Sequence, residues 1–79
     1  MKEVIVSIYD GGYNWSIHIN NRTYHRDDEF TKTPIRVRKL FNIIYNAHYL
    51  NMKIQPILKL HKIDRLIICE DGTIEIYNK

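Results

Sequence analysis

The chain has 79 residues, 44% of them apolar, and a single cysteine, so its size suits one small domain without an internal disulfide. The apolar content argues against a disordered chain. No charged leader opens the sequence and no apolar run approaches the roughly 18 residues that span a bilayer, so we expect a soluble cytoplasmic protein that does not enter the membrane.

Two alternating segments at the N-terminus predict a β-hairpin. Apolar residues alternate along residues 3–9 and again along residues 13–19, on either side of Asp10-Gly11-Gly12. With Gly11 and Gly12 as the loop, both apolar sets fall on one face. The expected pairs are Ile8 with Trp15, Val6 with Ile17 and Val4 with Ile19.

A third strand is predicted over residues 22–26, because Asn20-Asn21 tolerates the positive φ of a tight turn. Tyr24 would join Ile17 on the core face. The opposite face would collect the polar residues Ser7, Ser16, His18, Thr23 and His25. Residues 27–29, all acidic, are expected to form a loop.

Residues 33–50 predict the central helix. Thr33 can act as N-cap, and Pro34 suits the first helical position. Apolar positions recur at three- and four-residue steps along Val37, Leu40, Phe41, Ile44 and His48, and the stripe is widened by Ile43, Ala47 and Leu50. The opposite band holds no carboxylate and consists of Arg38, Lys39, Asn42, Asn46 and Tyr49, with Tyr45 at its margin.

The C-terminal third predicts a short helix and a second hairpin. Residues 52–63 favour a helix, with a strand as the alternative. Asp71-Gly72 favours a tight turn that pairs Cys69 with Ile74 and Ile67 with Ile76. The predicted fold is one α+β domain of residues 1–79. Its antiparallel sheet, made of the N-terminal three-stranded meander and the C-terminal hairpin, packs on one central helix, with a short second helix.

No motif in the sequence indicates a catalytic centre. Ser16 and His25 form the only serine–histidine pair that the predicted register supports, and no glycine-rich turn into a helix supplies an oxyanion hole. The histidines are too scattered for a local metal signature, and one cysteine is too few for a zinc finger. We expect no enzyme, no cofactor and no metal.

Charge is concentrated in the middle of the chain and suggests an acidic partner. Residues 1–32 carry 4 basic and 5 acidic side chains, residues 33–65 carry 7 and 1, and residues 66–79 carry 1 and 3. Arg36, Arg38 and Lys39 lie early in the helix, where the helix dipole disfavours positive charge. Such a conflict can mark a binding site. Alternatively, the acidic residues 27–29 fold back and neutralise it.

These observations predict a small non-enzymatic protein that occupies the surface of a macromolecular partner. The expected binding residues are Arg38, Lys39, Asn42, Tyr45, Asn46 and Tyr49, on an acidic face of a protein partner; a homodimer is also possible. Rich in Asn, Ile, Lys and Tyr, the chain is similar in style to phage or mobile-element inhibitors of host defence proteins. The competing surface is the open sheet face.

The alternative is a basic nucleic-acid-binding module. Phosphate contacts would come from Arg36, Arg38, Lys39, Lys53, Lys59 and Lys62, and Tyr45 or Tyr49 would stack on bases. Trp15, Ile17, Ile19, the Asn20-Asn21-Arg22 turn, Phe30 and the helix with Ala47 loosely resemble the arm-binding domains of phage-type integrases and the related AP2-like domains. This resemblance spans about residues 12–50 and implies a βββα core that reads DNA with its sheet. The family's DNA-facing strands are rich in Arg and Lys, whereas this chain offers Ser, His and Thr there.

Overall fold

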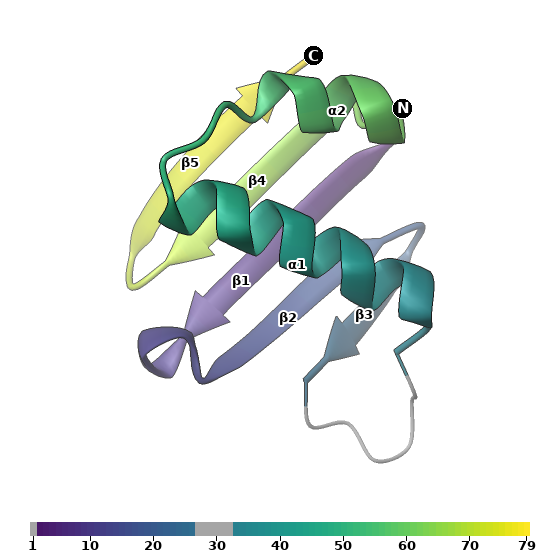
Figure 1. Cartoon of the computed structure of the whole chain (residues 1–79). Coiled ribbons are helices and arrows are strands. Elements are labelled where there is room, and N and C mark those ends of the chain that lie inside the picture. Colours follow the sequence, from purple (N-terminus) through teal and green to yellow (C-terminus); the bar gives the residue numbers. More distant parts are fainter. Residues whose placement is uncertain (1, 27–32) are drawn as a thin grey trace.

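A mixed five-stranded sheet with two helices on one face forms the α+β fold of this protein (Figure 1). The computed structural model describes residues 2–26 and 33–79. The strand order in the sheet is β3-β2-β1-β4-β5. Along the chain the elements are β1 (Glu3–Tyr9), the short helical turn η1 (Asp10–Gly12), β2 (Asn14–Ile19), β3 (Arg22–His25), α1 (Ile35–Tyr49), α2 (Gln55–His61), β4 (Arg65–Glu70) and β5 (Thr73–Asn78).

The N-terminal meander has the predicted register. The β1–β2 pairs are Val4 with Ile19, Val6 with Ile17 and Ile8 with Trp15. The ladder closes at Tyr9 and Asn14, so the connection comprises residues 10–13 rather than the two glycines alone. In the second turn Asn20 and Asn21 have φ of 54° and 64°, the two positive values that a type I′ turn requires.

One strand pairing contradicts the predicted antiparallel sheet. β4 lies next to β1 and runs parallel to it, from Glu3 beside Arg65 to Ile8 beside Glu70. The reason lies in the connection, because the helical segment returns the chain to the end of the sheet where β1 begins. Both strands are central and carry apolar residues on both faces, Ile5 and Ile67 on the face without helices. In chain order β1, β2 and β3 precede α1, and β4 and β5 extend the sheet beyond β1.

α1 supplies most of the helical side of the core. It begins at Ile35 with Pro34 as its N-cap residue, one position later than predicted. Its buried residues are Val37, Leu40, Phe41, Ile44 and Ala47. Ile43 and Leu50 are not part of this stripe, since they are 41% and 69% exposed on a flank of α1 that the sheet does not reach.

α2 is the predicted second helix, so α1 is not the only helix that covers the sheet. It buries Leu58, whereas Leu60 is 77% exposed. Figure 1 shows both helices on the same face, with α1 crossing the strands diagonally. Among the described residues, no helix is long and apolar enough to cross a membrane.

The C-terminal hairpin pairs as predicted, and one of its two faces packs against the helices. Cys69 lies opposite Ile74 and Ile67 opposite Ile76, in the predicted register. The helices instead cover the alternate positions, where Leu66 and Ile68 are fully buried. Ile74 and Ile76 are therefore exposed, and Cys69 is partly exposed on the open face of the sheet.

Candidate functional site

The predicted binding band lies on the outer surface of α1. Five of its six members are exposed, among them Tyr49 at 62%, and Tyr45 is half-buried. The other four exposed members carry short or cationic polar side chains. The four are Arg38, Lys39, Asn42 and Asn46. Arg38, Asn42, Tyr45 and Tyr49 follow one another at steps of three or four residues, so they form one row along the helix.

A stack of aromatic rings connects this row to the core; we call it the aromatic ladder (Trp15, Phe41, Tyr45 and Tyr49). The ring centroids of Trp15 and Phe41 are 4.0 Å apart, those of Phe41 and Tyr45 5.6 Å, and those of Tyr45 and Tyr49 5.3 Å. These separations lie within the range of favourable aromatic pairs or just below it. The exposed ring of Tyr49 is therefore supported from below by rings packed against the sheet.

Gly12 holds the middle of the ladder in place. Its φ is +94°, and a Cβ on it would lie 2.6 Å from the Tyr45 hydroxyl oxygen. Only glycine satisfies both the backbone conformation and this close approach. The loop between β1 and β2 thus packs against the hydroxyl end of Tyr45 on α1.

The helix layer, residues 35–62, contains no carboxylate. It holds six of the chain's 12 Lys and Arg residues and none of its 9 Asp and Glu residues. The six are those of the predicted nucleic-acid set, and all are exposed: Arg36, Arg38 and Lys39 on α1, Lys53 between the helices, Lys59 on α2 and Lys62 just after it. The predicted neutralisation by residues 27–29 lies outside the described residues.

The open sheet face carries the polar row expected of it. Ser16 lies beside His25 on β3, and the ring of His18 hydrogen-bonds Thr23 Oγ1 at 2.8 Å. Within residues 2–26 and 33–79 no cluster of three His, Cys, Asp or Glu side chains has the geometry of a metal site. This face is polar toward β3 and apolar toward β5, where Ile74 and Ile76 are exposed.

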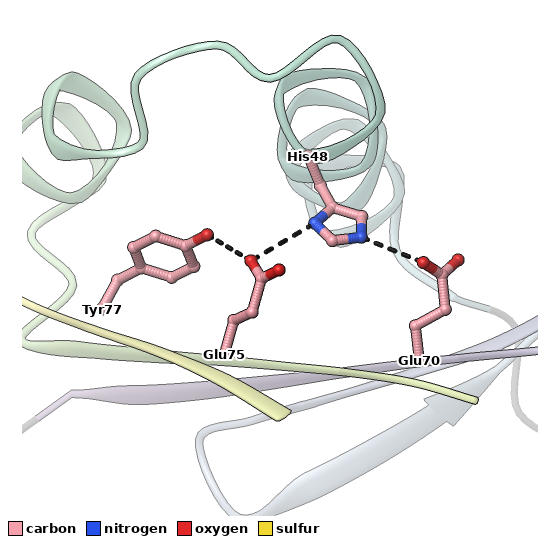
Figure 2. A network of polar contacts seen from close by, with 4 residues as sticks. All are labelled: His48, Glu70, Glu75 and Tyr77. Atoms are coloured by element: carbon pink, nitrogen blue, oxygen red, sulfur yellow. Dashed lines mark hydrogen bonds and ion pairs between the residues drawn. The ribbon is translucent and has the colours of Figure 1, made fainter. Parts of the chain in front are cut away.

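A second polar cluster lies under the C-terminal end of α1; we call it the His48 network (Figure 2). His48 Nε2 lies 3.2 Å from a Glu70 carboxylate oxygen, and Nδ1 lies 3.7 Å from Glu75 Oε2. Tyr77 donates its hydroxyl proton to the same Glu75 oxygen. This hydrogen bond, together with burial and the negative charge of Glu75, raises the pKa of Tyr77 to about 12.

The His48 network was not predicted from the sequence. It joins α1 to both β4 and β5, so it holds the C-terminal hairpin against the helix (Figure 2). The available signal was that Glu75 and Tyr77 alternate along the last strand. His48 itself was expected in the buried stripe, and its side chain is 14% exposed.

No family model matches the chain, and neither a curated protein nor a solved structure matches it.

Proposed function

We propose that this chain is a non-enzymatic binding protein whose helix layer docks on an acidic face of a protein partner. The observation that carries the proposal is the aromatic ladder, which ends in the exposed Tyr49 ring of a helix layer that itself contains no carboxylate, although Glu70 and Asp71 line the hollow beside Tyr49. Tyr and Arg are the residue types most enriched among binding hot spots, and Arg38 lies in the same row as Tyr49.

Stacking on Tyr45 lowers the rotamer entropy that Tyr49 would lose when a partner binds it. A side chain that is free in solution loses rotamer entropy on binding, about 0.5–1.5 kcal/mol for a mobile one. Stacking on Tyr45 already restricts the Tyr49 ring, whose centroid lies 5.3 Å away. The Tyr49 side chain therefore loses less conformational entropy when a partner covers the ring.

The charge of the helix layer supplies the selectivity. Six cationic side chains without a neighbouring carboxylate in the layer create a field that attracts acidic surfaces and repels basic ones. Such a field raises association rates and excludes wrong partners, while the desolvated anchor provides affinity.

Site-directed photo-crosslinking tests the proposal. A photo-reactive phenylalanine replaces Asn46 in the centre of the row, and a second version carries it at His25 on the open sheet face; both positions are exposed. From a bacterial lysate, the probe at position 46 should crosslink one protein in stoichiometric amount. The probe at position 25 should not crosslink that protein.

Measuring the affinity of variants for the captured protein then identifies the residues that bind it. The double variant Arg38→Ala, Tyr49→Ala should keep its melting temperature and lose the captured protein, since hot-spot truncation costs about 2 kcal/mol or more. The matched variant His18→Ala, His25→Ala should bind like the parent. The reverse pattern would move the binding surface to the sheet and refute the docking of the helix layer.

The biological setting that we propose is inhibition of a host protein by a phage or mobile-element product. Its support is the Asn-, Ile-, Lys- and Tyr-rich composition of a short chain. Stoichiometric addition of the purified chain should then abolish the activity of the captured host protein. A captured protein that stays fully active when saturated would contradict inhibition while leaving the binding intact.

Nucleic-acid binding is the second candidate, because a carboxylate-free layer with six exposed cations also suits phosphates. Anisotropy with random single- and double-stranded DNA and RNA decides between the two. Binding to phosphates through several cations should fall steeply and log-linearly between about 50 and 200 mM salt. Absence of binding at low salt would eliminate this candidate.

A further inference from the structure

A cavity of about 290 Å³ lies between the start of α1, the end of α2 and the β2–β3 corner of the sheet. Its polar lining comes from Lys2, Asn20, Arg22, Arg36 and His61. None of the described residues that line it is acidic. Three separate parts of the chain thus bring the cationic side chains Lys2, Arg22 and Arg36 to one hollow.

Arg22 occupies an unusual place for an arginine. It pairs with Ile19 across the β2–β3 ladder and lies two residues before the buried Tyr24. Residues two apart on a strand point to the same face, so Arg22 lies on the sheet face that the helices cover. Arg36 reaches the same cavity from the first turn of α1. Arg22 and Arg36, both exposed, therefore line one space, and a guanidinium group can donate two parallel hydrogen bonds to an oxyanion.

Lys2 is fixed in position beside them. Its ammonium group donates a hydrogen bond to the His61 carbonyl oxygen at 3.1 Å, and its backbone N–H donates to Asp64 Oδ2 at 2.8 Å. An ammonium group has three protons, so this anchoring leaves donors for a ligand. His61 Nε2 is buried without a hydrogen-bond partner among the described residues, which marks a polar wall that the protein itself does not satisfy.

The remaining wall of the cavity is apolar, so the ligand needs an apolar part as well as an anionic one. Ile19, Val37 and Leu40 line the cavity together with Tyr24. A volume near 290 Å³ is at the lower end of the range of small-molecule sites. The ligand that fits is small, with an anionic end for the cations and a flat or apolar body for this wall.

We propose that this cavity binds a small organic phosphate of about nucleotide size. A phosphate monoester carries a charge of about −1.5 to −2 at neutral pH, which the two arginines and one lysine match better than they match a single carboxylate. The guanidinium groups hold the phosphate oxygens and the apolar wall holds the organic body. The site is separate from the row of Arg38 and Tyr49 and shares only Arg36 with the six cations of the helix layer.

Nuclear magnetic resonance titration of the full chain tests the site, with AMP, adenosine and inorganic phosphate as probes. AMP should cause saturable amide shifts at residues of the cavity, inorganic phosphate should compete more weakly, and adenosine should not bind. The variant Arg22→Gln, Arg36→Gln should weaken AMP binding by about tenfold or more, since it loses both bidentate contacts. The control Arg26→Gln, Arg65→Gln loses the same charge on the sheet and should bind as the parent does.

A second pair of variants keeps the arginines intact. Asn20→Asp adds a carboxylate at the cavity, and Asn21→Asp adds one at the next position of the same turn, outside the lining. Both positions have positive φ, which Asp tolerates as Asn does. Asn20→Asp should abolish AMP binding, and Asn21→Asp should weaken it only slightly.

Three results would overturn the site. The first is the absence of saturable shifts with AMP at millimolar concentration. The second is adenosine binding as tightly as AMP, since the cations would then not contact the phosphate. The third is an equal loss of affinity in the test and control variants of both pairs, which would reduce the effect to general charge.

Discussion

Gly12 has both a positive φ and no space for a Cβ beside Tyr45, whereas its neighbour Gly11 has only the positive φ. Both have positive φ, +94° and +64°, but only a Cβ at Gly12 would collide with Tyr45, while nothing lies within 4 Å of one at Gly11. The pair therefore separates backbone strain from the packing of the aromatic ladder.

Alanine at each glycine should cost different amounts of stability. Gly11→Ala is expected to lower the free energy of unfolding by about 1 kcal/mol through backbone strain alone. Gly12→Ala adds the displacement of Tyr45 and should cost about 2–3 kcal/mol. Urea unfolding of both variants measures the difference, and the near-ultraviolet tyrosine signal should change only for Gly12→Ala. Equal losses would mean that Gly12 does not fix the ladder.

The raised pKa of Tyr77 makes stability depend on pH in the alkaline range. The folded chain keeps the Tyr77 proton up to about pH 12, whereas the unfolded chain releases it near pH 10.0. Between these values the unfolded state binds fewer protons, so stability falls as pH rises through this window. Below pH 10.0 the contribution is fully present.

Ultraviolet absorbance titration should show one tyrosine ionising near pH 12. In Glu75→Gln that tyrosine should ionise closer to pH 10.0, because the hydrogen bond to a carboxylate and the nearby negative charge are both lost. Glu70→Gln is the control, since Glu70 contacts His48 and not Tyr77. If Glu75→Gln leaves the titration unchanged, burial and not Glu75 causes the shift.

At the scale of elements, the His48 network is the polar link between α1 and the C-terminal hairpin. A double-mutant cycle of His48→Ala and Glu70→Ala should give a coupling energy of about 0.5–1 kcal/mol, small because Glu70 is 31% exposed. Hydrogen exchange of β5 amides should accelerate in His48→Ala, while β2 amides keep their protection. A coupling indistinguishable from zero would leave His48 with a packing role only.

The sequence predicted those elements whose pairing is local. Each hairpin register followed from alternation across a short turn, as with Val6 opposite Ile17 and Cys69 opposite Ile74. The parallel β1–β4 pairing was missed because no local pattern specifies which free strand edge a distant strand joins. The signal present was that Ile5 and Ile67 make both strands apolar on two faces, as central strands are.

The local part of the candidate site was predictable from the sequence, and its long-range contacts were not. Helical spacing alone gives the exposed row of Arg38, Asn42 and Tyr49 on α1. The ladder contact between Trp15 and Phe41 depends on how the first hairpin docks on α1, which sequence spacing does not specify. The basic cavity needs four parts of the chain at once and is visible only in the folded structure.

At the scale of the whole molecule, charge is divided between the helix layer and the rest of the chain. All 9 acidic residues lie outside residues 35–62, while half of the 12 basic residues lie inside that range. Like charges in one layer repel one another and lower stability, and the first turn of α1 holds no acidic residue to favour its dipole. The helix layer therefore carries an electrostatic cost to stability that a change of charge can relieve.

Reversing one of these charges should therefore move stability and binding in opposite directions. Arg38→Glu is expected to raise the free energy of unfolding by about 0.5 kcal/mol at low salt, because a carboxylate near the α1 N-terminus favours the dipole. The gain should shrink near 1 M salt, where the Debye length is about 3 Å. Asn46→Glu, near the C-terminal end of the same helix, should destabilise by a similar amount. Binding of the captured partner should be lost in Arg38→Glu; a variant that gains stability and still binds would show that the cations of the helix layer do not recognise an acidic face.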